Sequence, residues 1–165
     1  MRNRIKRELT QAALLLSAAI LTVAIGFMSA KAKEGDNVMA DAKTKDGWNE
    51  LTPAEERVIV NKGTEPPFSG EYVDFKKDGT FVCRRCETPL FKSEAKFNSG
   101  TGWPSFDDAI GDNVKEVPDA DGVRTEIVCA TCGGHLGHVF RGEGFTDKNT
   151  RHCINSSSLD NEPEG

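Results

Sequence analysis

The sequence has no excess of positive charge outside its first 32 residues. The chain of 165 residues carries a formal charge of −5. Residues 1–32 contribute +4, which leaves −9 for residues 33–165. The charged residues of the first segment are Arg2, Arg4, Lys6, Arg7, Lys31 and Glu8. Nucleic-acid binding requires clustered cations that neutralise phosphates, so an acidic domain without a basic stripe argues against a nucleic-acid partner.

Internal repeats and low-complexity tracts are also absent, and one long apolar run interrupts an otherwise ordinary soluble composition. This run, residues 12–28, follows the basic segment and precedes Ala30-Lys31-Ala32. A basic flank, an apolar stretch and small residues are typical of an export signal, with a candidate cleavage site after Ala32. A buried core helix is the alternative, and the basic flank disfavours it.

The length of the apolar run leaves cleavage open. Seventeen residues exceed a usual signal core but fall short of the ~20 that span a bilayer. A cleaved signal peptide and an uncleaved membrane anchor both fit residues 1–32. Either one predicts an exported, periplasmic or otherwise extracytoplasmic protein that meets the membrane only through this segment.

The remaining chain is long enough for one domain with a single hydrophobic core. Residues 33–47 are polar and aperiodic, which predicts a linker. The domain is expected over residues 48–160. It opens with a helix over 53–62, in which Thr52 is the N-cap, Glu55 completes a capping box and Gly63 ends the helix.

The rest of the domain has the pattern of antiparallel β structure. "YVDFKKDGTFVCRRC" predicts a hairpin turning at Asp78-Gly79, and "VKEVPDADGVRTEIVCATC" predicts a second one turning at "DADG". "HLGHVF" predicts a further strand. The final "LDNEPEG" is acidic and is expected to fray, so residues 161–165 are predicted to be a disordered tail.

Four of the five cysteines form two C-x-x-C pairs separated by 42 residues: Cys83 with Cys86, and Cys129 with Cys132. Each short spacing can offer two thiolates to one side of a tetrahedral Zn²⁺, and four sulfur ligands leave no open position. The sequence therefore favours a structural zinc site. Two disulfides are the alternative, because exported proteins fold in oxidising compartments.

A sixth cysteine is missing, so Cys153 has no partner in this scheme. Arg151 and His152 precede it, and nearby cations lower the pKa of a thiol. A reactive thiol is therefore favoured over a buried structural one. Upstream, His135 and His138 could supply a proton donor and its orienting partner, although metal ligation or a surface role fits them too. Trp103, bracketed by two glycines and a proline, is expected either in the core or as an exposed aromatic platform.

Four motifs in register, "CRRCETPLF", "NSGTGWPSF", "CATCGGHLGHVF" and "RHCINSSSL", resemble the B-type methionine sulfoxide reductases over residues 48–160. These enzymes reduce the R epimer of methionine sulfoxide. The resemblance implies a mainly β fold with two antiparallel sheets, β-tent-like, with a short N-terminal helix and a zinc clip. It also implies a monomer that acts on oxidised proteins, and on peptide-bound or free substrate, with a thioredoxin-like or other thiol as reductant.

The resemblance assigns the site residues. Cys153 corresponds to the catalytic cysteine, and Trp103 corresponds to the residue that holds the substrate methyl group. The residues expected around the cysteine are His138 as the acid, His135 and Asn155 as its hydrogen-bond partners, and Arg151. A non-catalytic zinc-knuckle module that binds a protein partner is the alternative, and it would have no use for a reactive thiol.

One position departs from the family pattern. Many relatives have S-G-C-G-W-P-S where this chain has Ser99-Gly100-Thr101-Gly102-Trp103-Pro104-Ser105. The resolving cysteine that would capture an oxidised Cys153 is therefore absent at Thr101. An external thiol is expected to take over this step.

Overall fold

A computed structural model describes residue 44 and residues 46–164. The predicted export signal or anchor, and residues 33–43 and 45 of the predicted linker, lie outside these residues. No helix in the described part of the chain has the length and apolar character needed to cross a membrane. The elements in chain order are α2 (Pro53–Ile59), β1 (Thr80–Cys83), β2 (Pro89–Lys92), η1 (Ser93–Ala95), β3 (Lys96–Phe97), β4 (Ser105–Phe106), β5 (Val114–Pro118), β6 (Thr125–Cys129), β7 (His135–Arg141), β8 (Thr150–Ile154), η2 (Ser156–Ser158) and β9 (Leu159–Glu162).

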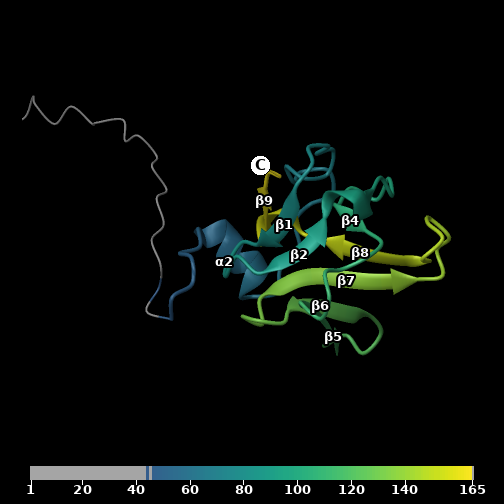
Figure 1. Cartoon of the computed structure of the whole chain (residues 1–165). Helices are drawn as coiled ribbons and strands as arrows, with labels where there is room; N and C mark the ends of the chain where they lie inside the picture. The colour runs from purple at the N-terminus through teal and green to yellow at the C-terminus, as the bar shows by residue number, and fades with distance from the viewer. Residues whose placement is uncertain (1–43, 45, 165) are drawn as a thin grey trace, which may run out of the picture. The chain divides into compact units, whose positions relative to one another are not determined.

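The strands form two antiparallel sheets, as predicted (Figure 1). The smaller sheet has the order β2-β1-β9, and the larger has the order β3-β4-β8-β7-β6-β5. Strand β8 is central in the larger sheet, with β4 and β7 as its neighbours. Since β9 follows β8 after only the short turn η2, the chain passes directly from one sheet to the other.

An aromatic cluster joins the two sheets. Phe81 of β1 and Phe91 of β2 come from the smaller sheet, and Phe106 of β4 comes from the larger one; all three are fully buried. The rings of Phe91 and Phe106 stack with centroids 4.4 Å apart, and Phe81 meets Phe106 edge-on at 5.0 Å. Buried aromatic pairs in these geometries add about 0.5–1.5 kcal/mol each to the stability gained by area burial.

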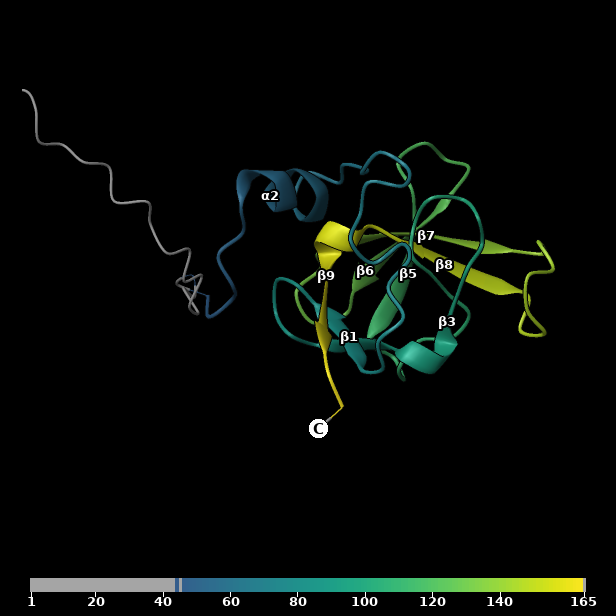
Figure 2. The ribbon, with the colours of Figure 1, turned by 90° about the horizontal axis from the view of Figure 1, so that it is seen from above.

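The helix α2 begins as its sequence predicts. The Thr52 side chain accepts from the Glu55 amide, and the Glu55 carboxylate accepts from the Thr52 amide at 2.7 Å, completing the capping box. The helix ends at Ile59, three residues earlier than predicted. Lys62, rather than Gly63, takes the left-handed conformation (φ +55°), while the Gly63 amide bonds to the Arg57 carbonyl. The helix packs on η2 and β7 (Figure 2).

Two expectations about the strands are wrong. Residues 71–79 form turns and loop rather than the first strand of a hairpin, so β1 begins at Thr80 and pairs with β2 and β9. The tail does not fray from Leu159, because residues 159–162 form β9 against β1, with Phe81 opposite Asn161. The second predicted hairpin, β5–β6, and the strand at "HLGHVF" are confirmed.

Candidate active site and metal centre

The four paired cysteines converge at the ends of two strands. Cys83 ends β1 and Cys129 ends β6, while Cys86 and Cys132 lie in the turns that follow. The two turns share one hydrogen-bond pattern. The first cysteine's amide donates to the residue five ahead, at 2.9 Å in both turns, and its carbonyl accepts from the residue four ahead. Two local turns of the same geometry thus present four thiols to one point.

The spacing of these sulfur atoms fits a metal and not disulfides. All four lie within 4.8 Å of one another, with 3.7 Å between Cys83 and Cys132 and 3.5 Å between Cys86 and Cys129. A tetrahedron with metal–sulfur bonds of ~2.3 Å has sulfur–sulfur edges of about 3.8 Å. Disulfide sulfurs lie about 2 Å apart, and all four cysteines are free. The cluster is a candidate metal centre that joins the smaller sheet to the larger one.

The fifth cysteine lies on the opposite face of β8 from its neighbour His152. His152 is buried against Phe91, with ring centroids 5.6 Å apart, and its Nδ1 donates to the Phe106 carbonyl at 3.1 Å. Burial lowers the pKa of His152. His152 is therefore a neutral core residue, and the expectation that it supplies a cation to Cys153 is wrong.

Arg151 lies on the same face of β8 as Cys153 and is buried itself. Its guanidinium donates to the Glu143 carboxylate at 2.8 and 3.0 Å and stacks 4.5 Å from the Phe140 ring centre. Burial raises the pKa of Cys153, whereas the charge and hydrogen bond of Arg151 lower it. The net direction is upward, because removing the thiolate from water outweighs the attraction of Arg151. The sequence identified this cation correctly but not the net direction of the pKa shift.

His138 lies directly opposite Cys153 in the β7–β8 pairing, which places both side chains on the same face of the sheet. Its Nε2 is 2.5 Å from a carboxylate oxygen of Asp119, in the β5–β6 turn. Asn155 and His135 were expected to orient His138 by hydrogen bonding. In the structure Asp119 is the partner of Nε2, while His135 bonds to Glu126 and Asn155 bonds to backbone groups.

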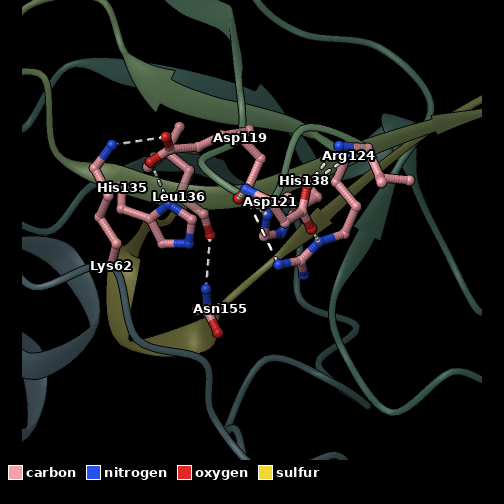
Figure 3. Close-up of polar contacts among 10 residues, drawn as sticks. Lys62, Asp119, Asp121, Arg124, His135, Leu136, His138 and Asn155 are labelled. Atoms are coloured by element: carbon pink, nitrogen blue, oxygen red, sulfur yellow. Dashed lines mark hydrogen bonds and ion pairs between the residues drawn. The ribbon is translucent and has the colours of Figure 1, made fainter.

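His135 has a separate acidic partner. Its Nδ1 is 2.7 Å from Glu126, whose other oxygen accepts from Lys62 at 2.8 Å (Figure 3). The ring of His135 is 2% exposed, and burial lowers its pKa despite the raising effect of Glu126. The two histidine rings meet edge-on with centroids 5.5 Å apart. They are therefore neighbours in packing, and each has its own carboxylate.

Asn155 and Trp103 are both tied to the loop at Glu65. Asn155 uses its side chain on backbone groups: it accepts from the Glu65 amide at 3.0 Å and donates to the Leu136 carbonyl at 3.1 Å. Trp103 Nε1 donates to the Glu65 carbonyl at 3.1 Å. The Glu65 carboxylate in turn accepts from the backbone amides of Ser156 and Ser157 at 2.7 and 2.6 Å. Glu65 thus positions both residues, which the sequence did not reveal.

These side chains enclose a small cavity. Its volume is about 110 Å³, and its lining includes Thr64, Trp103, Arg124, Gly137, His138, Phe140, Cys153, Ile154 and Asn155. Trp103 is half-buried there, which makes it a cavity wall rather than a core residue or a free platform. Thr101 also approaches Cys153, since its side-chain hydrogen bond lowers the pKa of that thiol. An apolar wall, a thiol and a histidine therefore meet in one pocket.

Comparison with known proteins agrees with this geometry. Residues 51–163 match the family model described as SelR domain. Peptide methionine sulfoxide reductase B3 of Arabidopsis thaliana is 54% identical over 110 residues, which is 66% of this chain and 62% of that relative. The chain belongs to the B-type methionine sulfoxide reductase family.

Other members of the family show the same level of similarity. The chloroplastic B2 protein of Arabidopsis thaliana is 51% identical over 124 residues, covering 74% of this chain and 61% of the relative. The B5 protein of Oryza sativa subsp. japonica is 47% identical over 129 residues, covering 78% and 95%. The matched region thus spans about three fifths of the first two relatives and nearly all of the third. The family model matches residues 51–163 and so includes β9, which supports the extension of the domain beyond residue 160.

Proposed function

We propose that this protein reduces the R epimer of methionine sulfoxide, with Cys153 as the nucleophile. The observation that supports this most directly is the shared cavity: Cys153, His138 and Trp103 line one pocket of about 110 Å³. A sulfoxide needs a nucleophile for its sulfur, an acid for its oxygen and an apolar surface for its methyl group. Here these are the Cys153 thiolate, His138 and the Trp103 ring.

The reaction is a two-electron exchange between two sulfur atoms. The Cys153 thiolate bonds to the sulfoxide sulfur while His138 protonates the sulfoxide oxygen. The hydroxyl then passes to the Cys153 sulfur, the bond between the sulfurs breaks, and its electron pair stays on methionine. Methionine sulfoxide is reduced to methionine, and Cys153 is oxidised to a sulfenic acid.

Recycling of Cys153 relies on an external thiol, because Thr101 stands in the place of a resolving cysteine. A donor thiol attacks the sulfenic acid, forms a mixed disulfide and releases water. A second donor thiol, from the same or another molecule, then frees Cys153 and leaves the donor as a disulfide. A thioredoxin-like dithiol or a small thiol can fill this role.

The metal of the four-cysteine centre is proposed to be Zn²⁺ in a structural role. Cys83, Cys86, Cys129 and Cys132 would hold it as thiolates, and four such ligands leave no position for substrate. Bound there, the metal would add a cross-link between the two sheets. The reacting groups belong to the separate pocket at Cys153.

The proposed setting is outside the cytoplasm, as a monomer that acts on oxidised proteins. This rests on residues 1–32, with their basic flank, apolar run and small-residue end. Protease accessibility in intact and permeabilised cells would test it: the domain should be digested in cells with a breached outer barrier and an intact inner one. Protection until the cytoplasm is opened would contradict it.

An epimer-resolved assay tests the activity. The full chain, supplied with dithiothreitol, should convert a peptide R-sulfoxide to methionine and leave the S-sulfoxide unreacted. Cys153→Ser should abolish turnover while retaining the native metal content, because the nucleophile is separate from the metal centre. Equal reduction of both epimers, or turnover by the Ser variant, would refute the proposal.

A further inference from the structure

The nitrogen Nε2 of His138 is already occupied before any substrate arrives. It lies 2.5 Å from Asp119 Oδ2, and a carboxylate at that distance requires the proton to be on Nε2. Within the described residues, Nδ1 of the same ring makes no hydrogen bond. Since His138 lines the cavity with Cys153, Nδ1 is the nitrogen left for a bound sulfoxide.

The turn that contains Asp119 holds the carboxylate of this residue toward His138. Oδ1 of Asp119 accepts from the Asp121 amide at 2.9 Å, which leaves Oδ2 to face His138. Backbone bonds between Asp119 and Arg124, and from Gly122 to Asp119, close the turn, and Gly122 takes a left-handed φ of +71°. The carboxylate is therefore fixed by the hairpin itself.

Arg124 bonds to the acidic residues of the same turn (Figure 3) and also lines the cavity. Asp121 accepts from the Arg124 side-chain Nε at 2.6 Å and from its backbone amide at 2.9 Å. The Arg124 guanidinium also lies 3.5 Å from Asp119 Oδ2. Two carboxylates and one guanidinium thus hold each other in one arrangement, and His138 contacts this group only through Asp119.

We propose that Asp119 is a positioning residue for the reaction: it fixes His138 as the Nε2–H tautomer and stabilises the imidazolium that donates its Nδ1 proton to the sulfoxide oxygen. This inference rests on the proposed sulfoxide reductase function. After the transfer, His138 is neutral. Its remaining proton stays on Nε2 and is donated in a hydrogen bond to the Asp119 carboxylate. Solvent then returns a proton to Nδ1, so the proton balance closes in each cycle.

The charges around His138 come from four elements. Asp119 and Arg124 belong to the β5–β6 turn, Glu126 to β6, His135 to β7 and Cys153 to β8. Glu126 is already bound to His135 and Lys62, and a protonated His135 would disfavour the imidazolium of His138. Asp119 is therefore the carboxylate in direct contact with the proposed acid.

Asp119→Asn tests the inference because the amide keeps the shape and removes the charge. In single turnover with a peptide R-sulfoxide, the rate at pH 8 should fall by about 10- to 100-fold. Asp112→Asn, the same change in an exposed loop, should keep the wild-type single-turnover rate. The alkylation profile of Cys153 separates any effect on the thiol from the effect on His138.

A spectroscopic measurement decides the question without turnover. The chain has three histidines, so long-range ¹⁵N–¹H spectra can be assigned with a His138→Gln variant. Wild-type His138 should be the Nε2–H tautomer, and Asp119→Asn should change its ring nitrogen shifts. An Nδ1–H tautomer in the wild type, or an unchanged single-turnover rate in a folded Asp119→Asn protein, would overturn the inference. If wild type lacks activity on R-sulfoxides, the proposed function fails, while the spectra still test the Asp119–His138 pair.

Discussion

Cys153 combines burial with a cation, and these two features act on its pKa in opposite directions. Burial raises the pKa and Arg151 lowers it, with burial dominant. Arg151→Met keeps the length of the side chain but removes the charge, so the pKa of Cys153 should rise further. The pH dependence of iodoacetamide labelling, followed by mass spectrometry of the Cys153 peptide, measures this change.

The matched control for this prediction is Arg141→Met. Arg141 lies on the adjacent strand β7 and pairs with Glu116 at the surface, at 2.5 Å. Its loss should leave the labelling midpoint of Cys153 in place. A downward move in the Arg151 variant, or equal moves in both variants, would show that Arg151 does not stabilise the thiolate.

Thr101 lies close enough to Cys153 to influence its pKa by hydrogen bonding. Because threonine has no thiol to capture an oxidised Cys153, one turnover of wild type should leave a Cys153 sulfenic acid that dimedone traps. One free thiol should be lost. Thr101→Cys should form a Cys153 disulfide instead, with the loss of two thiols, and should raise turnover with dithiol donors if recycling is limiting. Thiol counting and mass spectrometry distinguish these outcomes.

Asn98→Cys supplies the comparison for Thr101→Cys, because it adds a thiol at an exposed position three residues earlier. It should form no internal bridge. A wild-type disulfide between Cys153 and one of the four clustered cysteines would contradict the proposed external recycling.

At the scale of elements, the pairing of β7 with β8 depends on Gly137. A Cβ at this residue would lie 1.9 Å from the Cys153 carbonyl oxygen, and φ is +156°. Because this contact is with the backbone of the neighbouring strand and not with a flexible side chain, it cannot be relieved by a small side-chain movement. Gly137→Ala should therefore cost about 3 kcal/mol or more of unfolding free energy, measured by urea denaturation, and should also lower activity by displacing Cys153.

Gly142→Ala separates steric overlap from backbone strain. Gly142 also has a positive φ, +83°, but an added Cβ there meets no atom within 4 Å. Its substitution should cost about 1–2 kcal/mol, the strain of a left-handed alanine. Equal losses in the two variants would mean that the close approach to Cys153 contributes nothing.

Features encoded by nearby residues could be predicted from the sequence. The capping box of α2, the "DADG" turn and the two cysteine knuckles each depend on contacts within about six residues. The pairing of β9 with β1 does not, because Leu159 and Cys83 meet across 76 positions. The tail looked too polar to pack, yet an edge strand needs little apolar surface when backbone bonds hold it.

The candidate site divides in the same way. Motifs identified Cys153, His138 and Trp103, and the fold brings all three to one cavity. The partners that fix them were missed: Asp119 belongs to a turn, and Glu65 reaches Ser156 from 91 residues away. Acidic residues in loops are common and usually solvated, so nothing in their local sequence marks these two.

At the scale of the whole molecule, the candidate metal centre lies between the two sheets. It links the end of β1 to the end of β6 and therefore joins the two sheets at one point. Chelation, or Cys83→Ser, should remove one Zn²⁺ per chain and lower Tm by more than about 10 °C, since metal binding is coupled to folding. Metal analysis and differential scanning calorimetry test this.

Cys153→Ser serves as the control, because it removes a thiol outside the cluster. It should keep both the metal and Tm. A folded, active protein free of zinc would refute the structural role of the metal. A Cys83→Ser variant with unchanged Tm would show that the aromatic cluster alone holds the sheets together.

The side chains of β8 face the core and the cavity in turn, and this alternation limits which insertions and deletions the strand can accept. His152 is buried in the core and Cys153 lines the cavity, so adding or removing one codon within this strand would exchange their positions. Such a change would bury the nucleophile and place an imidazole in the pocket, even though every residue type was retained. The β7–β8 loop, residues 142–149, contains glycines at which an added Cβ meets no neighbour. Insertions and deletions in this part of the gene should be tolerated in the loop and eliminated in the strand.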